Sequence, residues 1–161
     1  DFDTGEYRPD TKLYPPRADF SVRTGHHFDM PEKLRRFYRQ TLDCASSGYN
    51  IFCAIGIRMM IEAICSDRSI HDGPNPAKPG STSRSNRLDG KIEGLVEAQY
   101  ITPAQARVLH ELRFIGNDAA HELLEIQSGD LRTALEVLEN AIVNIYDQDG
   151  RTQALRRRRS P

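Results

Sequence analysis

The chain has 161 residues, of which 38% are hydrophobic and 28% charged, and its formal net charge is −1 at pH 7. This size suits one domain with a single core, and the balance of apolar and charged residues excludes fibrous and membrane-embedded classes. No apolar run approaches the roughly 20 residues that cross a bilayer. The net charge also excludes a surface that is basic throughout, so any binding of RNA would use a local patch.

The three cysteines predict reduced, buried thiols in a cytoplasmic protein. Cys44, Cys53 and Cys65 are odd in number and lie in or near apolar, helical stretches, which is not the pattern of a disulfide framework. No Cys or His cluster has the spacing of a zinc site. We therefore expect no metal and no cofactor.

Both ends of the chain differ in composition from its middle. Residues 1–28 are rich in Pro, Gly, Asp and Arg and predict an extended arm or linker. Residues 149–161 form a basic tail with four consecutive arginines, Arg156 to Arg159, which we expect to be disordered. Because the sequence begins with Asp1 and not Met, we expect it to be a fragment of a longer protein.

Residues 29–148 predict an all-α domain, a bundle of about five helices with a long loop at about 67–87. Asp29 and Pro31 indicate the start of the first helix, which should run to about Ala45. The second helix, at about 49–66, is apolar around nearly its whole circumference, which is typical of a helix surrounded by others. The later helices are expected at about 88–98, from Thr102 onward, and from Ser128–Asp130 to about Tyr146. Thr102-Pro103-Ala104-Gln105 predicts a capping box with Pro at the first helical position. In the last helix Leu131, Leu135 and Leu138 keep helical period.

Arg58 and Glu62 are the only charges in the centre of the second helix and are four residues apart. A buried ion pair costs several kcal/mol in desolvation and persists only with good partners. Two interpretations stay open. The pair fixes the position of the helix or reaches the surface, or it belongs to the same site as the residues described next.

The helix that begins at Thr102 contains the string Arg113-Phe-Ile-Gly-Asn-Asp-Ala-Ala-His121. Arg113, Asn117 and His121 follow one another at four-residue steps, and each step advances only about 40° around a helix axis. The three side chains should therefore form a ladder along one side, which His110 shares. Gly116 either marks the close approach of another backbone or splits the helix, with Asn117 capping its second half.

Two stretches together resemble a known family: Gly56 to Cys65, and Leu88 to Leu95 continuing through Arg113 to His121. They are similar to the bacterial domain-of-unknown-function family 4145, which is associated with defence proteins and grouped with the HEPN superfamily. The likeness covers about residues 30–147, and Arg-x-x-Gly-Asn-x-Ala-x-His is its most specific element. Arg113 and His121 are spaced more widely than in the superfamily's usual nuclease motif, whereas Arg58, Glu62 and His121 resemble the pattern of its anticodon nucleases.

The resemblance implies a metal-independent endoribonuclease of a bacterial defence or toxin-type system. His121 would carry the proton, and Arg113 would hold the phosphate, with Arg58 as a second contact. Asn117 or Glu62 would orient His121. The implied partners are a second copy in a homodimer, an RNA such as tRNA, and other subunits of a defence system, without membrane contact. The alternatives are a non-catalytic binding or dimerisation module and a small-molecule or nucleotide sensor.

Overall fold

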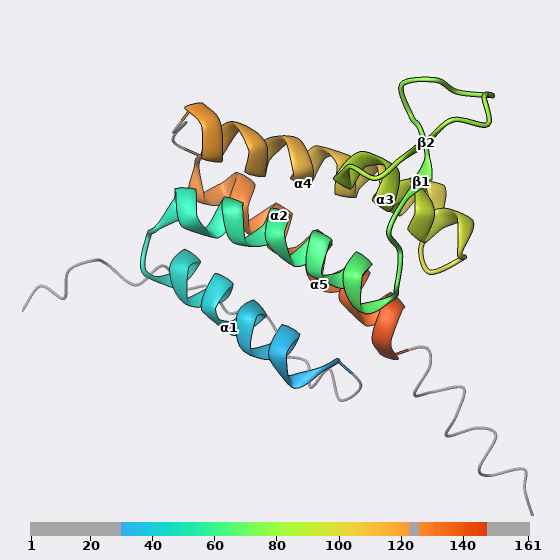
Figure 1. Ribbon diagram of the computed structural model, residues 1–161. Helices are drawn as coiled ribbons and strands as arrows, with labels where there is room; N and C mark the ends of the chain where they lie inside the picture. The colour runs from blue at the N-terminus through green and yellow to red at the C-terminus, as the bar shows by residue number, and fades with distance from the viewer. Residues whose placement is uncertain (1–29, 123–125, 148–161) are drawn as a thin grey trace, which may run out of the picture.

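The structure, a computed structural model, describes residues 30–122 and 126–147 and is an all-α bundle (Figure 1). The predicted fold class is thus confirmed. Asp29, the arm at 1–28 and the tail at 149–161 lie outside the described residues. In chain order the elements are α1 (Glu32–Ser46), α2 (Asn50–Asp67), β1 (Gly73–Pro74), β2 (Arg84–Ser85), α3 (Leu88–Glu97), α4 (Pro103–Glu122), α5 (Ser128–Ile142) and the π-helical turn η1 (Val143–Asp147).

Helix α2 lies at the centre and contacts each of the other four helices. It lies between α1 and α4, with α5 behind it and α3 near its C-terminal end (Figure 1). Its buried residues are apolar or small. The buried residues of α5 repeat with helical period: Leu131, Ala134, Leu135, Leu138, Ala141 and Ile142. No helix in the described part of the chain is long and apolar enough to span a membrane.

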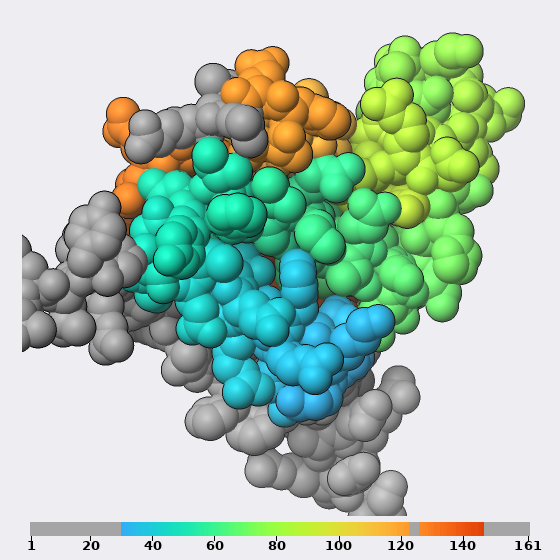
Figure 2. All heavy atoms as spheres, turned by 60° about the vertical axis from the view of Figure 1, so that its left-hand side comes forward, coloured from blue at the N-terminus to red at the C-terminus, as the bar shows by residue number. Residues whose placement is uncertain are grey.

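The expectation that α2 is surrounded on all sides is wrong. Phe52 is 66% exposed and Met59 is 49% exposed, and α2 is visible at the surface between α1 and α4 in the space-filling view (Figure 2). Four helices are too few to cover the whole circumference of a fifth, and α3 is short. One apolar face of α2 is therefore open to solvent, and it borders the predicted site residues.

The predicted start of α4 is confirmed. The Thr102 N–H donates to Gln105 Oε1 at 2.8 Å, and the Gln105 N–H donates to Thr102 Oγ1 at 3.3 Å. These two bonds form a reciprocal capping box with Pro103 as the first helical residue. Helix α4 then continues without a break to Glu122, so of the two interpretations of Gly116 the split is wrong.

Gly116 lies at a close contact between α4 and α2. A Cβ placed on it would lie 2.5 Å from Cβ of Arg58 and 2.9 Å from the carbonyl oxygen of Ala54. Neither neighbour is the end of a flexible side chain, so any larger residue forces the two helices apart. The absence of a side chain at 116 therefore sets the distance between α2 and α4.

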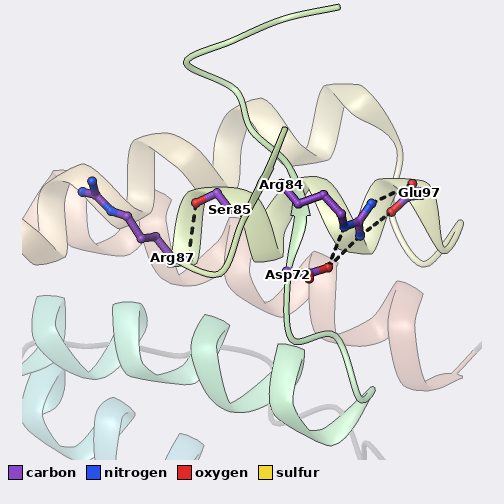
Figure 3. A network of polar contacts seen from close by, with 5 residues as sticks. All are labelled: Asp72, Arg84, Ser85, Arg87 and Glu97. Carbon is purple, nitrogen blue, oxygen red and sulfur yellow. Dashed lines mark hydrogen bonds and ion pairs between the residues drawn. The ribbon is translucent and has the colours of Figure 1, made fainter. Parts of the chain in front are cut away.

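The loop predicted at about 67–87 contains a short hairpin that was not expected. β1 and β2 pair antiparallel, with Gly73 opposite Ser85. Gly73 lies directly against Gly90 and Gly94 of α3, where no Cβ would fit. Arg84 then ties the hairpin to α3, because its Nε lies 2.8 Å from Asp72 Oδ1 and its terminal nitrogen 2.9 Å from Glu97 Oε2 (Figure 3).

We predict that Gly116→Ala lowers the free energy of unfolding by about 1–3 kcal/mol, because the new methyl group overpacks the contact between α2 and α4. Gly129→Ala is the matched control, since nothing lies within 4 Å of a Cβ at that position in α5. It should be neutral or stabilise by up to about 1 kcal/mol. Urea unfolding measures both variants, and equal stabilities for the two would contradict the close contact.

Candidate functional site

Three of the predicted site residues meet at the seam between α2 and α4. The Nε–H of Arg58 donates a hydrogen bond to Oδ1 of Asn117 at 2.6 Å. A terminal nitrogen of Arg58 lies 3.9 Å from Oε2 of Glu62, one turn along α2. Because Gly116 keeps the two helices close, the Arg58 side chain spans the seam and fixes the amide of Asn117.

Lys91 of α3 joins this network, and the sequence did not indicate it as a site residue. Its ammonium group donates to Oε1 of Glu62 at 3.0 Å. Lys91 lies in the second stretch that carries the family resemblance, but no spacing within one helix relates α3 to α2. Only the packing of α3 against α2 brings Lys91 to Glu62.

The network lies at the edge of the surface and has an excess of positive charge. The side chains of Arg58, Glu62 and Lys91 are 33%, 43% and 22% exposed. One carboxylate therefore faces two cations that both retain contact with water. An anion such as a phosphate can approach such a group without a large desolvation cost, and guanidinium and ammonium groups are its usual partners.

Arg113 lies one turn before Asn117 on the same side of α4. Its guanidinium carbon is 4.2 Å from the centroid of the Phe114 ring, and its Nε is buried without a hydrogen-bond partner. Its charge also acts on Asp89 of α3. Although burial opposes it, hydrogen bonds from the Gly90 N–H and the Ser85 hydroxyl, and then the charges of Arg87 and Arg113, hold the pKa of Asp89 below its usual value.

His121 lies in the last turn of α4 and is exposed. It continues the line of Arg113 and Asn117, as predicted for an unbroken helix. Among the described residues no hydrogen bond or ion pair joins it to Arg58, Glu62 or Asn117. The structure therefore joins Arg58, Glu62 and Asn117 directly, whereas Arg113 and His121 flank them along α4.

His110, on the same side of α4, has a partner of its own. Its Nε2 lies 2.8 Å from Oε1 of Glu93 in α3, and the two side chains are 17% and 31% exposed. This contact joins α3 to α4 two turns from Asn117. Glu93, like Lys91, shows that α3 supplies polar partners to residues on the other two helices.

Comparison with known families gives one result for this arrangement. The family described as "Domain of unknown function (DUF4145)" matches residues 39–158, which is more than half of the chain. The chain belongs to this family. No curated protein and no solved structure matches the chain.

The match includes all five predicted site residues of the DUF4145 domain, together with Lys91. In residues 30–122 and 126–147, no group of three or more His, Cys, Asp or Glu side chains is placed to hold a metal ion. The site thus consists of three cationic side chains, Arg58, Lys91 and Arg113, with an amide, a carboxylate and an exposed imidazole. These groups can bind an anion and transfer a proton.

The cysteines of the DUF4145 domain are poor nucleophiles. Burial raises the pKa of Cys53 and of Cys65 from 9.0 to about 12, and it also raises the pKa of the half-buried Cys44. A thiol attacks as the thiolate. At neutral pH these groups are therefore protonated and act as small apolar side chains in the core.

We predict that Ellman's reagent reacts slowly with Cys53 and Cys65 in the native protein, and faster with Cys44, which alone is not fully buried. All three should react at once in urea. Three equal reaction rates in the native protein would contradict the burial of Cys53 and Cys65.

The raised pKa values of Cys53 and Cys65 in the folded state also make stability depend on pH. The two thiols stabilise the fold below pH 9, and this contribution is lost between pH 9 and about 12.

We further predict that Arg58 and Asn117 are energetically coupled. In a double-mutant cycle with Arg58→Met and Asn117→Ala, the coupling free energy should be about 1–2 kcal/mol, because the bond is charge-assisted and partly buried. The control cycle is Glu32→Ala with Arg39→Met, an ion pair at 3.6 Å whose side chains are 70% and 63% exposed and whose coupling should stay below about 0.5 kcal/mol. Additive effects of Arg58→Met and Asn117→Ala would rule out the fixed amide.

Proposed function

We propose that this DUF4145 domain is a HEPN-type, metal-independent endoribonuclease of a bacterial defence or toxin-type system, acting in the cytoplasm as a homodimer. The observation that carries the proposal is the unbroken helix α4. It sets Arg113, Asn117 and His121 on one side, next to the Arg58 guanidinium that holds Asn117. Cations for a phosphate and an imidazole for a proton thus lie along one edge of the α2–α4 seam.

The reaction that suits these groups is transesterification of RNA. His121 removes the proton of a ribose 2′-OH, the 2′-oxygen forms a bond to phosphorus, and the bond from phosphorus to the 5′-oxygen breaks. The departing oxygen takes up a proton, so the products are a 2′,3′-cyclic phosphate and a 5′-OH end. Arg113 stabilises the charge that develops on the phosphate. Arg58 positions Asn117 and adds a second cation.

A homodimer makes this chemistry more effective. Each chain offers one exposed His on the site edge, whereas proton removal and proton delivery use a base and an acid together. The surface beside the site supports pairing of two copies, since Phe52, Met59 and Phe114 are 66%, 49% and 48% exposed. Large exposed apolar residues of this kind are enriched at protein interfaces.

A second function, a non-catalytic binding or dimerisation module within a defence or restriction complex, is favoured by one observation. Arg58 and Glu62 pair with each other, and their other polar partners, Asn117 and Lys91, belong to the same chain. Among the described residues, His121 forms no hydrogen bond or ion pair with Arg58 or Glu62. Under this proposal the network fixes α2, α3 and α4 against one another. The exposed apolar residues of α2 and α4 then serve for recognition alone.

The test is incubation of the purified chain with total tRNA and with a generic single-stranded RNA in the presence of EDTA. Wild type should cleave, and the ends should be 2′,3′-cyclic phosphates. His121→Ala should lose about 10²–10⁴-fold in rate, as expected for removal of a general acid–base. His71→Ala is the matched control, because His71 is exposed at the base of the hairpin and its removal should leave the rate unchanged.

Two outcomes would decide against the nuclease. A folded wild-type dimer that leaves both RNAs intact supports the binding module. Cleavage that is equal in wild type and His121→Ala assigns the activity to another residue or to a contaminant. Arg113→Gln separates the roles further, since loss of a phosphate contact should weaken RNA binding and cleavage together.

A further inference from the structure

A groove runs between α4 and α5 on a part of the molecule that the proposed site does not use. It encloses about 590 Å³. Apolar side chains from both helices and from Ile126 form its floor, among them Leu112, Ile115, Ala134 and Val137. An apolar groove open to water is a surface that a further segment of chain can cover.

The rim of the groove is acidic. Glu111 and Asp118 stand on α4 and Asp130 stands on α5, and all three residues are exposed. None of the described residues that line the groove is Lys, Arg or His. A segment that combines apolar residues with several positive charges is therefore complementary to the groove: its apolar residues match the floor, and its positive charges match the acidic rim.

We propose that residues 148–161 of the same chain occupy this groove. The segment contains Ala154 and Leu155, followed directly by Arg156, Arg157, Arg158 and Arg159. Leu155 supplies an apolar anchor for the floor, and the arginines pair with the three carboxylates of the rim. The family match extends to residue 158, so most of this basic run belongs to the domain itself.

The segment is long enough to reach the groove. α5 continues into η1, which ends at Asp147, and Thr133 of the groove lies fourteen residues earlier, about 20 Å at a helical rise of 1.5 Å per residue. Leu155 is eight residues beyond Asp147 and reaches up to about 27 Å in an extended chain. A segment that turns back along α5 therefore brings Leu155 level with Thr133, without a second copy.

The test is disulfide trapping in the 161-residue chain with Cys44→Ser as background. The probe pair is Thr133→Cys with Ala154→Cys, which keeps Leu155 as the anchor. The control pair is Ser66→Cys with Ala154→Cys, because Ser66 is exposed and adjoins Asp67, whose carboxylate accepts a hydrogen bond from Tyr146 at 2.8 Å. Ser66 is thus close to the start of the segment, and an unbound segment would meet it at least as often as Thr133.

The probe pair should form an intrachain disulfide at least about tenfold faster than the control pair, since docking raises the effective concentration of the two thiols. Glu111→Lys with Asp118→Lys should abolish this advantage, and about 1 M NaCl should reduce it. Asp43→Lys, a charge reversal on the exposed side of α1, should leave it intact. Equal rates for the two pairs, insensitivity to Glu111→Lys with Asp118→Lys, or covalent dimers in place of intrachain bonds would each overturn the proposal, whether or not the domain cleaves RNA.

Discussion

The close contact of α4 with α2 at Gly116 is the constraint on which the site depends. A backbone carbonyl of α2 and the stem of Arg58 occupy the space that a side chain at 116 would need. Because the helices are this close, the Arg58 Nε–H reaches Asn117 at 2.6 Å. A wider separation would lengthen this bond and leave a partly buried guanidinium without its amide partner, which costs more than the bond itself contributes.

The position of the network at the edge of the bundle explains how a charged cluster is tolerated on an apolar helix. Arg58 and Glu62 belong to α2, which packs against α1, α4 and α5. Their own side chains keep a third or more of their surface in water. The desolvation cost of a fully buried pair is thereby avoided, and the same exposure leaves the cations accessible to an anion.

The polar network also includes residues of α3, and the position of α3 depends on its glycines. Gly90 and Gly94 let the hairpin strand at Gly73 pack directly on the helix, and Arg84 fastens the hairpin from the other side. With α3 held in this way, Lys91 meets Glu62, and Glu93 meets His110. The segment at about 67–87, for which the sequence predicts only a loop, thus helps to position side chains at the site.

The sequence by itself determined the features that depend on one element at a time. Helical period placed Leu131, Leu135 and Leu138 in the core, and the Thr102–Gln105 pattern predicted the capping box, because each depends on residues three or four positions apart. The four-residue spacing from Arg113 to His121 likewise places these residues on one side of α4, because the helix is continuous. Only the tertiary structure decided that Lys91 meets Glu62, that Arg58 binds Asn117, and that one apolar face of α2 stays open. These features depend on the distance and register between helices, which residues far apart in the chain set together.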